Sequence, residues 1–402
     1  MRGILSKLLI TCFAYLSKMI LNNVLVLEKG KLKRADVEFD SIIRRMGKVG
    51  KGDDCSNYFL MPGLRNAHVH LASRLVSGVA VGLGKYEYFN EIGFRIHDRR
   101  KDEDIYNASL LACIEQLKHG VTHVDTMDMK PEIVIKAIRR AGLGYTACLP
   151  LKDFGEEAGY VRDGFKRSLE FNMLGLANEY ECTPQLIREG LEFGKEHDLP
   201  IHMHACETRM ELRHFKHITG MRTIPYLERI GFLDYDVRLA HCTFADSGDI
   251  LMLAEHDVPV LHCPTSNSLI SRNVPDVKLM LDNGIRVRIG TDSFAWNPNP
   301  SVLHEAFVSH NVTGISLLQA YLLTHEPLVE GEPATFSLVD LSALMPFNSV
   351  NEFLVKLMNT NAVSSVFVEG KEVVKDGNVI GFDEGKLRKR VEKAREKLFK
   401  SR

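Results

Sequence analysis

Short apolar runs alternate with longer amphipathic stretches from Met61 to about residue 330. Such alternation is typical of repeated strand–helix units. Eight runs are strand-like: Leu64–His70, Val121–Asp125, Tyr145–Leu149, Met173–Ala177, Ile201–Cys206, Val237–Cys242, Val258–Cys263 and Ile285–Thr291. Because no G-x-G-x-x-G motif follows the first run, a closed barrel is favoured over an open dinucleotide-binding sheet. We predict an α/β fold with a (β/α)8 TIM barrel over residues 61–330.

Helices are expected between these strands, where apolar residues recur with helical periodicity. The predicted helices are Asp104–Lys118, Pro131–Ala141, Pro184–His197, Ile224–Ile230, Ser247–His256 and Val274–Asn283. Both ends of the chain differ from this middle part, because they contain short β-type runs separated by turn residues. We therefore predict a composite β-sandwich domain from residues 19–60 and 331–382, and a charged, solvent-facing C-terminal helix over 383–402.

The composition limits the classes of partner. The 51 Lys and Arg residues nearly balance the 52 Asp and Glu residues, so no strong field favours nucleic acid or an acidic membrane. The eight cysteines include no C-x-x-C pair, which argues against a disulfide scaffold or zinc ribbon and suits a reducing cytoplasm. We expect a cytoplasmic protein with a small-molecule substrate and no nucleic-acid or membrane partner. Homo-oligomerisation stays open.

The first eighteen residues resemble a weak secretory signal. Arg2 and Lys7 precede an apolar run from Leu8 to Leu16, but no small-residue cleavage site follows. This run is too short to span a bilayer, which needs about 20 apolar residues. Because Met19 opens a strand-like segment, we expect the natural chain to begin at Met19.

Two histidines end the first strand of the predicted barrel. His68 and His70 are two residues apart, so their side chains share one face of the strand. Both imidazoles can therefore point into the mouth of the barrel, where the active sites of this fold lie. An isolated H-x-H is weak evidence, because histidines also occur in ordinary polar loops.

A second histidine pair lies in the fifth strand. His204 is nearer the C-terminal end of the strand and is predicted to face the site. His202 would lie one layer deeper, and we interpret it as a structural residue or as support for a ligand. Glu207 follows at the turn, from which a carboxylate can reach a metal-bound water and shuttle its proton.

Two further strands end in polar residues. His241 ends the sixth strand and Asp292 follows the eighth. An Asp after a strand is often a helix cap. However, histidines and a carboxylate at the same end of the first, fifth, sixth and eighth strands converge in a closed barrel, which predicts a metal site. The adjacent Cys206, Cys242 and Cys263 are expected to pack behind it.

With these residues in place, the chain resembles the amidohydrolase superfamily, in the branch of cytosine deaminase, the triazine hydrolases and the adenosylhomocysteine/methylthioadenosine deaminases. The resemblance covers residues 20–381. It rests on five motifs in order: Met61–His70, His204–Thr208, Ala240–Cys242, His262–Asn267 and Gly290–Ser293. The flanking β segments, ending in Val368–Lys371, are similar to the composite small domain of such proteins.

The resemblance implies a role for each site residue. The ligands of a divalent metal ion would be His68, His70, His204 and Asp292. Glu207 would be the proton shuttle, His241 would hydrogen-bond the attacking water or the developing oxyanion, and Asp292 would also accept the water's proton. Relatives with two metals use a lysine on the fourth strand, whereas residues 172–178 contain none. We therefore expect one ion, Zn²⁺ in the first instance, with Fe²⁺ or Mn²⁺ as alternatives.

These parts predict a metal-dependent amidohydrolase that deaminates a heteroaromatic amine, such as a nucleoside or a base. Two alternatives stay open: hydrolysis of a cyclic amide, an imidazolone or a ring-halogen bond in the same site, and a catalytically silent metal-binding protein. Release of ammonia distinguishes deamination from hydrolysis of these other bonds.

The substrate contacts are expected in the loops that follow the strands. The predicted contacts are Glu87, Asn178, Arg209, Asn267 and Trp296. Trp296, the only tryptophan, can stack on a flat ring, and Glu87 can hold a sugar hydroxyl. Nucleoside deaminases of this branch usually carry a Trp-Leu pair near such an acidic residue and a Pro-His pair after the fourth strand. This chain has neither, so the resemblance does not fix the substrate.

Overall fold

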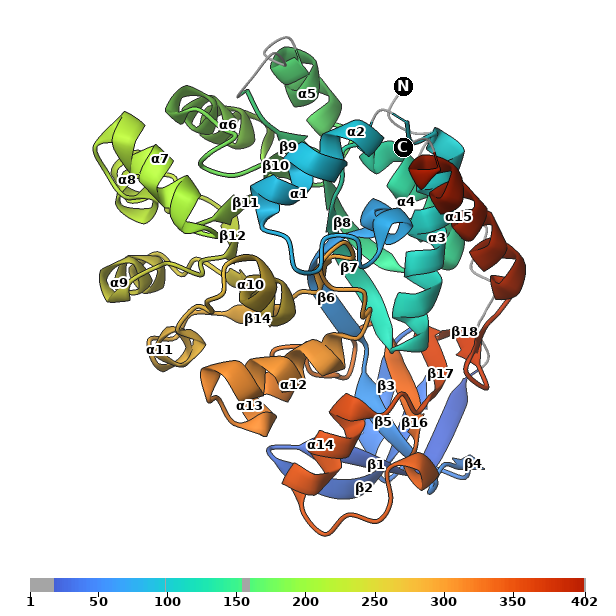
Figure 1. The fold of residues 1–402 in the computed structure, drawn as a ribbon. Coiled ribbons are helices and arrows are strands. Elements are labelled where there is room, and N and C mark those ends of the chain that lie inside the picture. The colour runs from blue at the N-terminus through green and yellow to red at the C-terminus, as the bar shows by residue number, and fades with distance from the viewer. Residues whose placement is uncertain (1–17, 98, 154–159, 401–402) are drawn as a thin grey trace, which may run out of the picture.

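The computed structural model describes residues 18–97, 99–153 and 160–400. The expected start of the natural chain at Met19 concerns residues 1–17, which lie outside this description. The described strands form three sheets, with helices between and around them (Figure 1). None of the described helices combines the length and the apolar content that crossing a bilayer requires.

Two parallel sheets contain all eight predicted strand runs. The larger sheet has the order β14-β13-β12-β11-β10-β9, and the smaller has the order β15-β6-β7-β8. Their strands are β6 (Leu64–His70), β7 (Val121–Met127), β8 (Gly144–Cys148), β9 (Pro150–Leu151), β10 (Leu174–Leu176), β11 (Ile201–Ala205), β12 (Val237–His241), β13 (Val260–His262), β14 (Val287–Ile289) and β15 (Asp292–Ser293). The predicted strands thus lie in two hydrogen-bonded ladders rather than in one continuous ring. Several are shorter than the apolar runs that predicted them.

The end of β14 approaches β6 closely. Gly290 follows β14, and a Cβ atom at this position would lie 2.8 Å from the Cβ atom of His68 and 2.9 Å from its backbone nitrogen. Only glycine permits this approach. The Asn66 amide donates to the Thr291 hydroxyl at 2.7 Å, and the Thr291 N–H donates back to Asn66 Oδ1 at 3.0 Å. These contacts bring the end of the last strand beside the first.

Helices follow most of the parallel strands. The six predicted helices correspond to α3 (Asp102–Lys118), α4 (Pro131–Ala141), α6 (Pro184–His197), α8 (Thr223–Arg229), α9 (Ser247–Glu255) and α11 (Val277–Asp282). Helix α4 shows why the prediction holds: Pro131 occupies its first turn, and Gly142 ends it at a φ of +86°. The helices that the sequence did not predict include α5 (Tyr160–Ser168), α7 (Arg209–Thr219), α10 (Pro264–Ile270), α12 (Val302–Thr313), α13 (Leu317–Leu322) and α14 (Val350–Asn359).

The segment between β6 and α3 is built from short helical turns. They are η1 (Leu71–Val76), α1 (Lys85–Tyr88), η2 (Phe89–Gly93) and α2 (Phe94–His97). Tyr88 is buried. This segment lies near the ends of the parallel strands (Figure 1).

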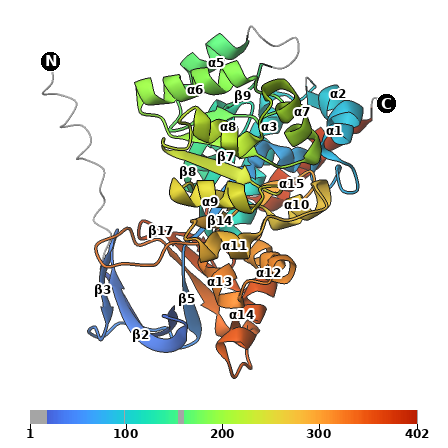
Figure 2. The ribbon, with the colours of Figure 1, turned by 90° about the vertical axis from the view of Figure 1, so that its left-hand side faces the viewer.

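Both chain ends contribute to the third sheet, which lies at one end of the molecule (Figure 2). Its order is β19-β18-β17-β16-β5-β1-β2-β3, with β4 paired to β1. The strands are β1 (Met19–Glu28), β2 (Lys31–Phe39), β3 (Ile43–Gly47), β4 (Asp53–Asp54), β5 (Tyr58–Pro62), β16 (Phe336–Asp340), β17 (Val363–Val368), β18 (Lys371–Lys375) and β19 (Asn378–Val379). The two ends join where β16 pairs antiparallel with β5, with Phe336 opposite Pro62.

The C-terminal helix α15 (Glu384–Phe399) is not only a solvated face, as the sequence had suggested. One stripe of its side chains is buried: Leu387, Val391, Ala394 and Leu398. Arg395 also donates to the Ser77 carbonyl at 2.7 Å. The helix packs against α3 (Figure 1). The many charged residues of this segment led to the prediction of a solvated helix. The spacing of its buried apolar residues is nevertheless that of an amphipathic helix.

Candidate active site

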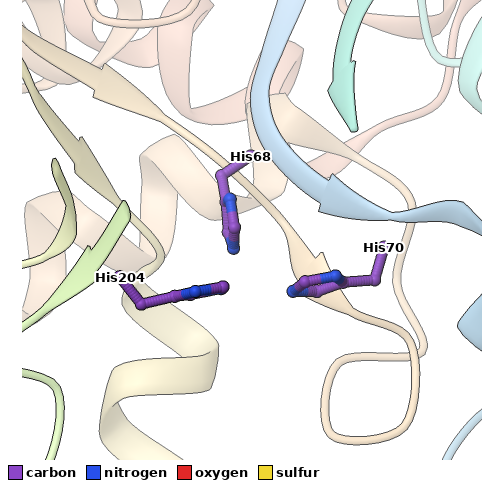
Figure 3. Close-up of side chains that lie close together, drawn as sticks. All are labelled: His68, His70 and His204. Carbon is purple, nitrogen blue, oxygen red and sulfur yellow. The ribbon is translucent and has the colours of Figure 1, made fainter. Parts of the chain in front are cut away.

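Three imidazoles point toward one another at the ends of two parallel strands (Figure 3). His68 and His70 come from β6, where alternate side chains share a face, and His204 comes from β11. One nitrogen of each ring lies within 4.8 Å of the others. We call His68, His70 and His204 the imidazole cluster. The two strands are far apart in sequence, and the fold brings their ends together as predicted.

Each ring of the imidazole cluster is held through its Nδ1 atom. His68 Nδ1 lies 3.0 Å from Nε2 of the buried His202. His70 Nδ1 is bonded to the Met127 carbonyl, and His204 Nδ1 to the Ala177 carbonyl. These contacts orient the rings and leave the Nε2 atoms to face the centre of the cluster. Among the described residues, the buried His68 Nε2 has no hydrogen-bond partner.

Asp292 adds a carboxylate to the cluster. Its Oδ1 atom lies 3.4 Å from His68 Nε2 and 3.3 Å from His70 Nε2. Its Oδ2 atom accepts a hydrogen bond from the Ser266 hydroxyl. The backbone φ of Asp292 is +60° and that of His241 is +75°. Positive φ angles are uncommon in non-glycine residues and gather at functional sites.

Burial sets the protonation states of these groups. It lowers the pKa of His68 to about 4 and holds the pKa of His204 well below its usual value. Burial also lowers the pKa of His70, but the attraction of Asp292 outweighs this and leaves the pKa raised. Burial raises the pKa of Asp292, whereas the adjacent His68 and His70 rings outweigh this and place the pKa well below its usual value.

The donor set fits a divalent metal ion. Metal ligation requires neutral imidazoles and an ionised carboxylate, which are the states favoured at His68, His204 and Asp292. A cation would also replace the proton that Asp292 favours on His70. The orphaned Nε2 atom of His68 would gain a partner. A second grouping within 4.8 Å joins His68 and Asp292 with His241.

His241 and Glu207 lie next to this cluster. His241 ends β12, and its Nδ1 atom donates to Asn267 Oδ1 at 2.9 Å. Its Nε2 atom lies 3.8 Å from Oε2 of Glu207. Glu207 sits between β11 and α7, and only 2% of its surface is exposed. The Glu207 carboxylate and the His241 imidazole thus lie close to each other beside the imidazole cluster.

Comparison with known proteins decides the family. Residues 59–324 match the amidohydrolase family. The chain belongs to the amidohydrolase family. It is similar to 5-methylthioadenosine/S-adenosylhomocysteine deaminase 2 of Archaeoglobus fulgidus, with 28% identity over 94% of this chain and 97% of that one. It is also similar to 5'-deoxyadenosine deaminase of Methanocaldococcus jannaschii, with 27% identity over 91% and 97%.

The fold is shared with a solved structure that contains zinc. The crystal structure of an adenosine deaminase from Xanthomonas campestris with bound zinc aligns with a TM-score of 0.81. The alignment covers 94% of this chain and 98% of that one at 20% sequence identity, so it speaks for the fold alone. The predicted membership and enzyme class are confirmed: this amidohydrolase is a hydrolase of carbon–nitrogen bonds other than peptide bonds.

The site of this amidohydrolase opens into a cavity of about 990 Å³. His70, His204, Glu207, His241 and Asp292 all line it. Apolar side chains form much of the remaining wall: Val76, Tyr88, Phe89, Ile96, Ile105, Met127, Ile270 and Trp296. The site residues and the apolar wall therefore enclose one space.

Two of the five predicted substrate contacts line this cavity, namely Asn178 and Trp296. The other three are not among the described lining residues. Glu87 is exposed and accepts the Gly84 N–H at 3.1 Å, as a helix cap does. Arg209 is exposed and lies over the Phe244 ring. Asn267 is fully buried and holds His241 instead.

Several residues that support the site were not assigned these contacts from the sequence. Ser266 bonds Asp292, and Lys85 reaches Glu207 from the segment after β6. Glu179 is fully buried and accepts the Cys206 N–H at 2.8 Å. Neither Lys85 nor Glu179 belongs to a motif. Their contacts join segments that are far apart in the sequence, and a local sequence pattern does not reveal such contacts. Cys206, with Cys242 and Cys263, is buried as predicted.

Proposed function

We propose that this amidohydrolase hydrolytically deaminates a purine nucleoside or a related heteroaromatic amine. The observation that carries the proposal is the Glu207 carboxylate, which lies beside the imidazole cluster, 3.8 Å from His241, in the wall of a cavity of about 990 Å³. The relatives that are named deaminases of adenosine derivatives support release of ammonia as the reaction.

We assign the metal ligands as His68, His70, His204 and Asp292. Imidazole and carboxylate donors suit Zn²⁺, and they also suit Fe²⁺ or Mn²⁺. One ion is proposed, because residues 172–178, which contain β10, include no lysine that could bridge two. When bound, such an ion lowers the pKa of a coordinated water from about 15.7 toward 7 and so makes hydroxide available at neutral pH.

Three residues of the chain handle the protons. Glu207 gives a proton to a ring nitrogen, which makes the adjacent ring carbon electrophilic. Asp292 takes the proton that the attacking water loses. His241 donates from Nδ1 to Asn267 and, in its protonated form, can donate from Nε2 to the oxygen that adds to the ring. Asp292 then passes its proton to the amino group, which leaves as ammonia, and the hydroxyl proton of the adduct returns to Glu207, so that the ring carbon keeps the oxygen as a carbonyl.

The cavity wall supports a flat aromatic substrate. Trp296 meets Tyr88 edge to face with ring centroids 4.9 Å apart, and its Nε1 donates to the Leu83 carbonyl at 3.0 Å. The indole is therefore fixed and presents an apolar surface to the ring. The volume of about 990 Å³ lies near the upper end of ligand pockets, which run from about 300 to 1,000 Å³. We propose Asn178 and Trp296 as substrate contacts.

We also propose the arrangement that carries this site. The two parallel sheets would form one (β/α)8 barrel over residues 61–330, supported by the close approach of Gly290 to His68. Residues 19–60 and 331–382 would form the composite β-sandwich domain, supported by the pairing of β16 with β5. Residues 383–402 would form the C-terminal helical segment.

The test is ammonia release from the zinc-loaded protein with adenosine, 5'-deoxyadenosine, methylthioadenosine, adenosylhomocysteine and free adenine. Changing Glu207→Gln should lower kcat by about 10²- to 10⁴-fold, because a neutral amide cannot carry the proton. Zinc content should stay at the wild-type level. The matched control is Glu196→Gln on the exposed face of α6, which should leave the rate unchanged. A Glu207→Gln variant with a near-normal rate would overturn the assignment.

A further inference from the structure

A lysine enters the site from the segment that follows β6. Lys85 begins α1, and its side chain is 11% exposed. Its ammonium group donates to Oε2 of Glu207, and it also donates to Oε1 of Glu211 at 2.8 Å. A nearly buried cation therefore bridges the glutamate beside the imidazole cluster and a second carboxylate.

The second carboxylate is itself fixed. Glu211 is fully buried, and its Oε2 accepts the Thr208 N–H at 2.8 Å in the capping box of α7. Its Oε1 accepts the Tyr86 hydroxyl at 2.8 Å as well as Lys85. Because α7 begins two residues after Glu207, the same helix start sets the position of Glu207 and of the anchor. We call Lys85, Tyr86, Glu207 and Glu211 the lysine cluster.

The charges of the lysine cluster favour this arrangement. Burial alone would lower the pKa of Lys85, but Glu207 and Glu211 outweigh it and raise the pKa well above its usual value. The ammonium therefore stays charged at neutral pH. Burial raises the pKa of the neighbouring Glu179 to about 8, with Glu211 adding to the shift.

The bridge fixes one oxygen of Glu207. Lys85 bonds to Oε2, and the same atom lies 3.8 Å from His241 Nε2. A glutamate at a turn has several rotamers, and a proton donor must be held within hydrogen-bond reach of the substrate. Lys85 thereby restrains the carboxylate at Oε2, the oxygen that also faces His241.

We propose that Lys85 is a positioning residue that fixes the Glu207 carboxylate through Oε2, with Glu211 as its anchor. This inference rests on the proposed role of Glu207 as the proton carrier. Lys85 acts through Glu207 and takes no part in the bond changes. The segment after β6 would thus tune the reaction of this chain in addition to shaping the cavity.

The variants are Lys85→Met, Lys85→Arg, Glu207→Gln and the double variant Lys85→Met/Glu207→Gln, all assayed with zinc loaded. Lys85→Met should lower kcat by roughly 10- to 100-fold, in the range of mutations that remove an orienting partner. KM should change less than about twofold, because the substrate contacts remain. Lys85→Arg, which keeps the charge, should recover part of the rate. The matched control is Lys118→Met, which removes an ion pair with Glu384 outside the cavity and should leave kcat unchanged.

The double variant separates positioning from mere packing. If Lys85 acts through Glu207, the double variant should be no slower than Glu207→Gln alone. A crystal structure of Lys85→Met should show the Glu207 carboxylate turned away from His241. Wild-type kcat in Lys85→Met, or additive losses in the double variant, would overturn the inference.

These variants distinguish three outcomes: misfolding of Lys85→Met, failure of the proposed role of Glu207, and failure of the proposed role of Lys85. Should Lys85→Met not fold, the polar variant Lys85→Gln replaces it. Glutamine is one bond shorter and uncharged, so this variant should be slower than Lys85→Arg. Equal rates of the two would contradict the inference. Should Glu207→Gln retain activity, the proposed function of Glu207 fails first. Should Glu207→Gln be inactive while Lys85→Met is normal, only the role of Lys85 fails.

Discussion

The imidazole cluster and the lysine cluster face the same cavity but are held by different means. The imidazoles stand at strand ends, and two of the three Nδ1 atoms are bonded to backbone carbonyls, those of Met127 and Ala177. The lysine cluster joins a helix start to a segment of short turns through charged side chains. Backbone partners move little when side chains change, whereas an ion pair depends on both of its members.

This difference separates what the fold supplies from what the individual chain adds. Rigid strand ends hold the groups that must meet a metal ion within tenths of an ångström. The loops that follow the strands vary more freely and adapt the site to one substrate. A ligand change should therefore abolish function outright, and a change in the supporting contacts should lower it by degrees.

The largest effect is expected at the imidazole cluster itself. Changing His68→Asn removes a proposed ligand whose buried Nε2 atom has no hydrogen-bond partner within the described part of the chain. The variant should lose both its zinc and its turnover, with the rate falling to background, because hydroxide is no longer supplied at neutral pH. Metal analysis after dialysis and the ammonia assay measure the two losses.

The control for this prediction is a histidine of similar chemistry outside the site. His256 pairs with Asp234 at 2.9 Å and does not line the cavity. His256→Asn should keep full zinc content and rate. Retention of one zinc per chain by His68→Asn would remove this histidine from the ligand set.

The part of the site that lies at the strand ends, the imidazole cluster, was predictable from the sequence. The motif His68-x-His70 needs only the two-residue repeat of a strand to place both rings on one face. All eight strand runs were found, because apolar runs between amphipathic helices leave few alternatives. Their division into two ladders was not predicted, since hydrogen bonding between neighbouring strands depends on local twist and not on apolar content.

The side chains that the loops contribute to the site were only partly predictable from the sequence. Trp296 and Asn178 line the cavity, and their contact with the substrate stays a prediction, whereas Glu87 is exposed and caps α1. Lys85, two residues earlier, is the charged side chain of this turn that reaches the site. Nothing in the local sequence distinguishes a buried lysine from a solvated one, because its partners lie 122 and 126 residues away.

The next effect in size is expected where the two clusters meet. His241 lies between Asn267 and Glu207. Changing His241→Asn should lower kcat by about 10²- to 10³-fold, as does loss of one hydrogen-bond donor to a developing oxyanion. Zinc should remain bound, in contrast to His68→Asn. Loss of zinc from His241→Asn would instead place this residue among the ligands, as its grouping with His68 and Asp292 permits.

A smaller effect should follow from removing a support of the imidazole cluster. His202 contacts His68 Nδ1 at 3.0 Å, and burial keeps the pKa of His202 well below its usual value, so the ring is neutral. Changing His202→Leu should weaken zinc affinity by about 10- to 100-fold, because His68 loses its orienting partner. Competition with a chelator measures the affinity. Unchanged affinity would show that the strand alone orients His68.

The last prediction concerns stability rather than activity, and it rests on the buried carboxylate of Glu305. Burial raises the pKa of Glu305 to about 7, although Thr265 and Asn297 donate to it. The folded state therefore holds a proton that the unfolded chain releases near pH 4.5, so the free energy of unfolding should fall as pH rises from about 4.5 to 7 and then level off. The shift corresponds to roughly 3 kcal/mol at most.

Changing Glu305→Gln removes this titration, so the free energy of unfolding should depend less steeply on pH across the same window. Urea denaturation of both proteins at pH 5, 6, 7 and 8 gives the two slopes, and the comparison of slopes is unaffected by any constant loss of hydrogen bonds. Equal slopes would mean that Glu305 stays ionised in the folded protein. Glu305 would then be a buried anion beside Asp292, stabilised by hydrogen bonds from Thr265 and Asn297.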